Sequence, residues 1–370
     1  MNKTVIIFSG FNMRAVIAFI RTLEHQNVPY AIIAKSKDDV IFKTLYVSKV
    51  ISTRQQISLN FNDMLNSLQE VQKHFNSKSY IIAPSTEALN RFILDNLREF
   101  EKYNCIFPVV EKKLYEQVSD KYSFGKLCED NNILIPKEYS SIERVKLPFV
   151  AKPKHYIGKT GKTYIPQIIK NENDLKQFIL DYEQNDFYFQ EYVEGRSIYL
   201  LYYFDKNKKI YKFSQENLLQ QENGKSMLIA KPSEFHKNTI SLSFEKLFTD
   251  IDFRGLVMVE LKLTDNKFFM IEANPRFWGP SQLFIDANIN FFNCLLEDYG
   301  VLNKNDVDNL KIDRDIMYFW DDGISENIDD RNEVSFYNYS AHDFKKNSAL
   351  LNKIEVFNRE DTIKLYKRDI

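Results

Sequence analysis

Residues 256–264 and 268–274 form the pattern that most limits how this chain can fold. Within each segment, neighbouring side chains point to opposite faces with a period of two, and Asp265-Asn266-Lys267 forms a short polar turn between them. The pattern predicts an antiparallel hairpin. One face is apolar and is expected to be buried; it carries Val257, Val259, Leu261, Leu263, Phe269, Ile271 and Ala273.

The other face of the predicted hairpin carries Glu260, Glu272 and Asn274. If the turn closes at Asn266, the two glutamates lie opposite each other with Cβ atoms roughly 5 Å apart, which is unfavourable unless their charge is neutralised. An oxygen-preferring dication such as Mg²⁺ would neutralise it, and Mn²⁺ could replace Mg²⁺. Two simpler interpretations stay open, namely a solvated polar face and pairing of one carboxylate with Lys262.

Composition excludes several classes of protein. The chain has 370 residues, enough for two or three domains, and 50 basic residues balance 51 acidic ones. This balance leaves no excess of positive charge, which binding to nucleic acid or an anionic membrane would require. No apolar run approaches the ~18 residues of a membrane span. The three cysteines form no CxxC pair, which favours reduced thiols and a cytoplasmic protein.

The first 110 residues alternate strand and helix patterns, which predicts a parallel sheet with helices on its faces. The expected strands are 4–8, 30–34 and 80–83, and the expected helices are 13–26 and 61–75. The first turn, residues 9–14, lacks the glycines of a GxGxxG motif. A dinucleotide-dependent oxidoreductase is therefore disfavoured.

Lys152 ends an apolar strand and is followed by a loop that contains Gly158 and Gly161. In such a place a cation can reach phosphate oxygens while the N–H groups of the loop cover them. The spacing does not fit a P-loop. A lysine that merely extends its charged group to solvent is the alternative.

Five short motifs follow one another in a fixed order: Asp120-Lys121, Phe149 to Lys152, Gln190 to Gly195, Glu260, and Glu272-Ala-Asn-Pro-Arg276. In this order they resemble the ATP-grasp superfamily, including its carboxylate-amine ligases and carbamoyl-phosphate-synthase-like members. The resemblance covers about residues 1 to 300. It implies an α/β and α+β chain with a Rossmann-like domain at 1–115, a lid lobe with a phosphate loop at 116–195, a catalytic lobe at 196–305 and an extension at 306–370.

The resemblance also implies a role for each matching residue. Lys121, Lys152, Gly158 and Gly161 would bind the ATP phosphates; Gln190, Glu191, Tyr192 and Val193 would form the hinge that contacts adenine; Glu260, Glu272 and Asn274 would hold Mg²⁺; and Arg276, with Lys152, would stabilise the transferred phosphoryl group. Ser197 stands where relatives often carry an acidic residue that binds the ribose.

The activity that the resemblance implies is ATP-dependent ligation, in which a small carboxylate becomes an acyl phosphate and an amine displaces the phosphate. A kinase and a carboxylate-thiol ligase would use the same phosphate machinery. A non-catalytic ATP-binding regulator would not need the complete set of site residues. We expect the substrate between the N-terminal sheet and the hairpin, near residues 9–14, Thr86, Glu87 and Arg276. Assembly into a homo-oligomer stays open.

Overall fold

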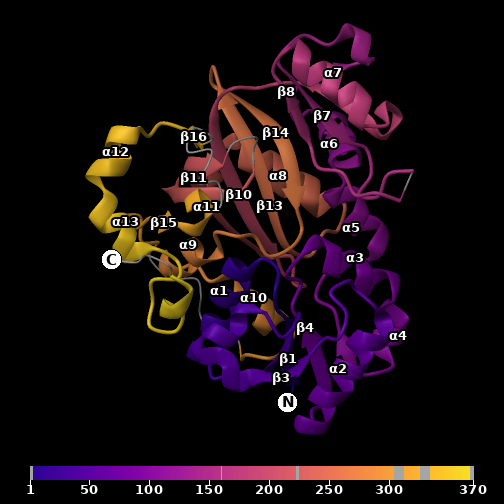
Figure 1. Cartoon of the computed structure of the whole chain (residues 1–370), viewed down its shortest axis with the longest axis vertical. Coiled ribbons are helices and arrows are strands. Elements are labelled where there is room, and N and C mark those ends of the chain that lie inside the picture. The colour runs from indigo at the N-terminus through magenta and orange to yellow at the C-terminus, as the bar shows by residue number, and fades with distance from the viewer. Residues whose placement is uncertain (1–2, 160, 222–224, 304–311, 326–333, 367–370) are drawn as a thin grey trace.

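A computed structural model describes residues 3–159, 161–221, 225–303, 312–325 and 334–366 (Figure 1). Its N-terminal part is built on a five-stranded parallel sheet with the order β3-β2-β1-β4-β5. The predicted parallel sheet is confirmed, and β3 and β5 are strands that the sequence analysis did not predict. The strands are β1 (Lys3–Phe8), β2 (Tyr30–Ala34), β3 (Val50–Thr53), β4 (Ser79–Ile82) and β5 (Cys105–Ile106). The helices are α1 (Met13–His25), α2 (Phe61–His74), α3 (Glu87–Asp95) and α4 (Leu97–Glu101).

A small antiparallel sheet with the order β6-β9-β7-β8 forms the middle of the chain. Two helices, α5 (Lys112–Ser119) and α6 (Lys121–Asp130), precede it. Its strands are β6 (Glu138–Tyr139), β7 (Phe149–Pro153), β8 (Gln167–Ile169) and β9 (Phe187–Glu191), and α7 (Glu172–Asp181) lies between β8 and β9 in sequence. Aromatic side chains, among them Phe149, Phe178 and Phe187, fill a core that belongs to this lobe alone.

The largest sheet has the order β14-β13-β10-β11-β12-β15, and β16 pairs with β11. Its strands are β10 (Arg196–Phe204), β11 (Ile210–Gln221), β12 (Met227–Ser233), β13 (Gly255–Thr264), β14 (Lys267–Asn274), β15 (Tyr318–Phe319) and β16 (Val334–Phe336). The helices are α8 (Thr239–Asp250), α9 (Ser281–Asp286), α10 (Phe291–Asp298), α11 (Asp322–Ser325), α12 (Ala341–Lys346) and α13 (Ser348–Ile354). Two of these strands, β15 and β16, come from the predicted extension, so part of that extension belongs to the sheet.

The N-terminal domain and the large sheet share an apolar core. Side chains of α1, α9 and α10 pack in one cluster with Val5 and Ile7 of β1 and with Leu201 and Tyr203 of β10. On the opposite face of the large sheet, α8 contributes Phe248 to a second cluster. This shared core fixes the large sheet against the N-terminal domain, and Figure 1 shows the two regions side by side.

The predicted hairpin forms, and Glu260 lies directly opposite Glu272. The turn contains two residues, Asp265 and Asn266, with φ angles of 46° and 61°. Positive φ at both positions is what a type I′ hairpin turn requires. Between the turn and the glutamates, β14 contains one extra residue, Ile271, which forms a β-bulge.

Because of this bulge, the predicted faces of residues 268–271 are wrong. Phe269 and Ile271 are predicted on the buried face, but Phe268 and Met270 pack there instead, because Leu261 pairs with Met270. Every residue from 268 to 271 is apolar, so the sequence pattern fits either register.

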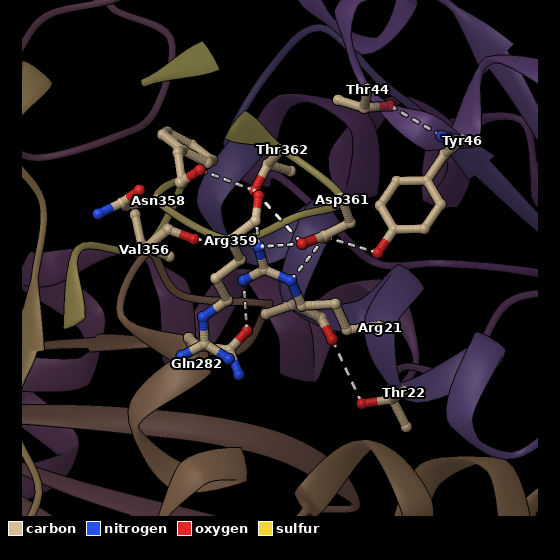
Figure 2. A network of polar contacts seen from close by, with 12 residues as sticks. Arg21, Thr22, Thr44, Tyr46, Gln282, Val356, Asn358, Arg359, Asp361 and Thr362 are labelled. Carbon is tan, nitrogen blue, oxygen red and sulfur yellow. Dashed lines mark hydrogen bonds and ion pairs between the residues drawn. The ribbon is translucent and has the colours of Figure 1, made fainter. Parts of the chain in front are cut away.

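The segment around Asp361 is held against the N-terminal domain by a polar network (Figure 2). Arg21 on α1 binds Asp361 through two contacts, Nε to Oδ2 at 2.8 Å and Nη2 to Oδ1 at 3.1 Å. The same guanidinium donates to Thr362 Oγ1 at 2.8 Å and to Gln282 Oε1 at 2.9 Å. The Tyr46 hydroxyl donates to Asp361 Oδ2 at 2.6 Å. These contacts tie the C-terminal segment to α1 and α9.

Replacing Asp361 by asparagine is expected to lower the free energy of unfolding by about 2 kcal/mol, because Arg21 then stays largely buried without an anionic partner. Burial raises the pKa of Asp361, but the hydrogen bond and charge of Arg21 lower it overall. A carboxyl group with a lowered folded-state pKa stabilises the fold above its unfolded pKa, and this contribution is lost as the pH falls. Urea denaturation should therefore show a difference between wild type and Asp361→Asn that shrinks from about pH 5 toward about pH 3. Equal midpoints at neutral pH would contradict this role.

Across the described ranges, none of the helices has the length and apolar character needed to traverse a lipid bilayer.

Candidate functional site

The polar face of the hairpin forms a row of hydrogen-bonded side chains. Lys121, the first residue of α6, places its Nζ 2.8 Å from Glu272 Oε2. Asn274 Nδ2 donates to the other oxygen of Glu272, Oε1, at 2.7 Å. Arg276 Nη2 donates to Asn274 Oδ1 at 3.1 Å. Lys121, Glu272, Asn274 and Arg276, which the sequence analysis predicts as site residues, therefore form one continuous row of contacts.

Lys152 approaches the same hairpin from β7. Its Nζ donates to the carbonyl oxygen of Ile271 at 3.0 Å, and only 5% of the residue is exposed. Ile271 is the bulge residue, so it has no cross-strand partner in the β13–β14 ladder. The bulge therefore provides the acceptor that holds Lys152 beside Glu272.

The pKa values of the two paired glutamates are shifted in opposite directions. Burial and the neighbouring charge of Glu272 raise the pKa of Glu260. Burial would also raise the pKa of Glu272, but the charge and hydrogen bond of Lys121 lower it overall. Burial and the like charge of Lys121 lower the pKa of Lys152 to about 8. Opposed shifts of this kind, caused by burial and close charges, are typical of functional sites.

A second layer of polar side chains lies behind Glu260. Ser197 Oγ is 3.5 Å from Glu260 Oε1 and accepts a hydrogen bond from Asn217 Nδ2 at 2.9 Å. Asn217 in turn accepts from Gln215 Nε2 at 2.7 Å. Ser197, the residue that departs from the family pattern, therefore contacts the carboxylate of Glu260 in this chain.

The polar face of the hairpin lines one cavity of about 1310 Å³. Its lining includes Lys121, Glu260, Glu272, Asn274 and Arg276. Within the described ranges, no cluster of three or more histidine, cysteine, aspartate or glutamate side chains could hold a metal. A cation at the hairpin would thus have two carboxylates and an amide as protein ligands.

The sequence of this region matches a known domain family. Residues 118–280 match the family model of the ATP-grasp domain. The chain contains an ATP-grasp domain. The matched range includes Lys121, Lys152, Gln190, the glutamate pair and Arg276. A comparison with curated proteins finds no match.

Solved structures share the fold of this chain. Biotin carboxylase from Campylobacter jejuni, solved with beta-gamma-ATP, is 14% identical with a TM-score of 0.64, over 84% of this chain and 74% of that one. A second structure is the biotin carboxylase domain dimer of 2-oxoglutarate carboxylase from Hydrogenobacter thermophilus, solved with MgADP, ADP and bicarbonate. It is 13% identical with a TM-score of 0.60, and the match covers 84% of this chain and 71% of that one. N5-carboxyaminoimidazole ribonucleotide synthetase from Thermus thermophilus is 12% identical with a TM-score of 0.58, and the match covers 80% of this chain and 77% of that one.

The glycine loop of the ATP-grasp domain is folded on itself. Gly158 N donates to Lys162 O at 2.8 Å, and Gly161 N donates to Gly158 O at 2.9 Å. Lys159 N donates to Asp186 Oδ2 at 3.1 Å. These N–H groups therefore have partners within the protein, and neither Gly158 nor Gly161 is among the residues that line the cavity. Phosphate binding by this loop stays a prediction, and it would require these contacts to open.

The predicted hinge lies at the end of β9. Gln190 is 3% exposed and pairs with both β6 and β7, whereas Glu191 N donates to Lys137 O at 2.8 Å. Among the described residues, Gln190 Oε1 has no hydrogen-bond partner. Residues 190–193 and Lys152 do not belong to the cavity lining described above. Their roles toward a nucleotide stay predictions.

The cavity also brings together residues that the motifs do not reveal. Residues 11–14, Thr86 and Glu87 line it, where a substrate is predicted. Trp320 and Phe357 line it as well, although they belong to the extension, whose role the sequence leaves open. The one signal for such residues is their aromatic character, which is common throughout this chain.

Lys152 gives a test of the site's electrostatics. Its folded-state pKa of about 8 lies below the ordinary value of 10.5, so between these values the unfolded chain keeps a proton that the folded chain has released. The free energy of unfolding therefore rises with pH in this window. Replacing Lys152 by methionine should remove that rise, measured by urea denaturation at several pH values. Identical pH profiles for both proteins would show that Lys152 titrates normally.

Proposed function

We propose that this chain is an ATP-dependent ligase that converts a small carboxylate into an acyl phosphate and joins it to an amine, with release of ADP and phosphate. The observation that carries the proposal is the hydrogen-bonded row Lys121, Glu272, Asn274 and Arg276 along a large cavity of an ATP-grasp domain. Residues 116–195 would act as the lid lobe and residues 196–305 as the catalytic lobe.

ATP would bind between these lobes. Lys121 and Lys152 would contact its phosphates, and the backbone of residues 190–193 would contact adenine. Lys121 now pairs with Glu272, so a bound phosphate would compete for the same ammonium group. The complexes of the two carboxylases with beta-gamma-ATP and with MgADP support a nucleotide site in this fold.

The donor set at the hairpin fits Mg²⁺ or Mn²⁺. Glu260 and Glu272 face each other on paired strands, and Asn274 offers an amide oxygen two residues further along β14. Mg²⁺ characteristically takes one or two carboxylates and completes its shell with water and substrate phosphates. When bound, the metal would reduce the negative charge on the phosphates that the carboxylate must approach.

The reaction needs no nucleophile from the protein. A carboxylate oxygen of the substrate attacks the γ-phosphorus of ATP, and the bond to ADP breaks. Arg276 would stabilise the charge on the transferred phosphoryl group. The nitrogen of the amine then attacks the acyl carbon, phosphate leaves, and the nitrogen loses a proton to give the amide.

The test is a screen for ADP release with Mg²⁺ and ATP over paired carboxylates and amines. ADP that forms only when both partners are present would support ligation. ADP formed with an alcohol or a thiol in place of the amine would instead identify a kinase or a thiol ligase. Tight ATP binding without turnover on any pair would identify a regulator.

A further inference from the structure

One part of the cavity is lined by large apolar side chains. It is formed by the loop between β1 and α1, by the 3-10 helix Val40–Lys43 and by the C-terminal extension, which contribute Phe11, Val40, Trp320 and Phe357. Phe11 is 48% exposed and Val40 is 37% exposed. This wall offers apolar surface to a ligand, in contrast to the charged hairpin that lines the same cavity.

Arg14 is held rigidly in this wall. Its Nη1 donates to Met227 O at 2.9 Å and to Tyr318 Oη at 3.3 Å. The guanidinium carbon lies 3.7 Å from the centroid of the Trp320 ring, which is a cation–π contact. Among the described residues, Nε and Nη2 of Arg14 have no hydrogen-bond partner. The Nη1 group of the guanidinium is thus held by the protein, while Nε and Nη2 can donate hydrogen bonds to a ligand.

Gly279 packs closely against the guanidinium group of Arg14. A Cβ atom at position 279 would lie 2.7 Å from Arg14 Nη2 and 2.8 Å from its Cζ, closer than real Cβ atoms approach other heavy atoms, so a larger residue here would displace Arg14. Both Arg14 and Gly279 line the cavity. A fixed guanidinium with a free edge is suited to a carboxylate, because its planar N–H groups match the two oxygens.

We propose that the carboxylate substrate has an aromatic or long aliphatic body, that Arg14 binds its carboxylate group, and that its body packs on the wall of Phe11, Val40, Trp320 and Phe357. This inference rests on the proposed function and names its substrate class. The cavity of about 1310 Å³ exceeds the range of about 300–1,000 Å³ usual for small-molecule pockets, so a second ligand fits beside a nucleotide. Bicarbonate or a small dicarboxylate would gain nothing from the apolar wall.

Intrinsic fluorescence can test this binding directly, because the chain has two tryptophans and both Trp278 and Trp320 line the cavity. The probes are 3-phenylpropionate and octanoate, with 3-phenylpropanamide as the uncharged analogue and succinate as the analogue without an apolar body. We expect the first two to change the emission saturably, and the amide and succinate to bind at least about tenfold more weakly. No change with either apolar carboxylate, or tighter binding of succinate, would overturn the proposal.

The variant Arg14→Met should bind 3-phenylpropionate no better than the amide, while its affinity for the amide stays at the wild-type value. Arg21→Met is the matched control, because Arg21 lies on the same helix and also holds the C-terminal segment but is absent from the cavity lining. This control should keep the preference for the carboxylate over the amide. If Arg14→Met keeps that preference too, Arg14 has only a structural role and the proposal is wrong.

A calorimetric titration with Mg²⁺-ATP separates this inference from the proposed function. Wild type and Arg14→Met should bind Mg²⁺-ATP equally. If Mg²⁺-ATP binds and turnover follows succinate or bicarbonate rather than apolar carboxylates, the substrate class is wrong and the ligase function stands. If Mg²⁺-ATP does not bind, the proposed function fails whatever the carboxylates do.

Discussion

Replacing Glu272 by glutamine is expected to lower the rate of ADP release by about 10²- to 10³-fold. The amide keeps the size of the side chain and an oxygen that can accept from Asn274, which now donates to Oε1 at 2.7 Å. It lacks the charge that Lys121 contacts at 2.8 Å and that a dication requires. The measurement is a coupled assay for ADP at saturating ATP and Mg²⁺, with the substrate pair that the screen identifies.

Glu216→Gln is the matched control for this variant. Glu216 is also a buried carboxylate, with 4% exposure, and it pairs with Arg196 at 2.7 Å. It lies opposite Ile198, on the face of β10 and β11 that turns away from the cavity residue Tyr199. We expect Glu216→Gln to keep the rate within a few-fold. Full activity in Glu272→Gln, or equal losses in both variants, would contradict a catalytic role for Glu272.

Arg276→Met is expected to lower kcat on the order of 10²-fold, with little change in the KM for ATP. Asn274 Oδ1 and the carbonyl of Phe277 accept from the two terminal nitrogens of Arg276, at 3.1 and 3.0 Å, and orient the guanidinium. A charge held in this way contributes mainly where negative charge develops, which is on the transferring phosphoryl group. Steady-state kinetics with varied ATP give both parameters.

Arg254→Met serves as the comparison for Arg276, because the Arg254 side chain is 49% exposed and pairs with Asp252 near the surface. It should leave both parameters unchanged. A raised KM for ATP with unchanged kcat in Arg276→Met would instead mean that Arg276 binds ground-state ATP and has no special role in the transfer.

The centre of the site could be predicted from the sequence because it depends on short-range geometry. The period of two and a polar turn are enough to place Glu260 opposite Glu272, and the structure has this pairing. The bulge at Ile271 could not be predicted, since four consecutive apolar residues satisfy the burial of either register. That bulge matters, because its carbonyl holds Lys152.

The wall of the cavity could not be predicted because it depends on contacts between distant parts of the chain. Arg21 and Asp361 are 340 positions apart, and their contact helps to place the extension on the N-terminal domain. Arg14 and Trp320 meet in the same way. No local periodicity encodes such pairs, so the extension appears in the sequence only as a region of weak secondary-structure signals.

The most direct test of the central claim, that the hairpin and its lysines form a Mg²⁺-ATP site, is isothermal titration of the protein with ATP in the presence and absence of Mg²⁺. The account predicts saturable binding at one site that depends on Mg²⁺, is weakened in Glu272→Gln and is kept in Glu216→Gln. Absence of ATP binding, or binding of equal strength without Mg²⁺ and in Glu272→Gln, would contradict it.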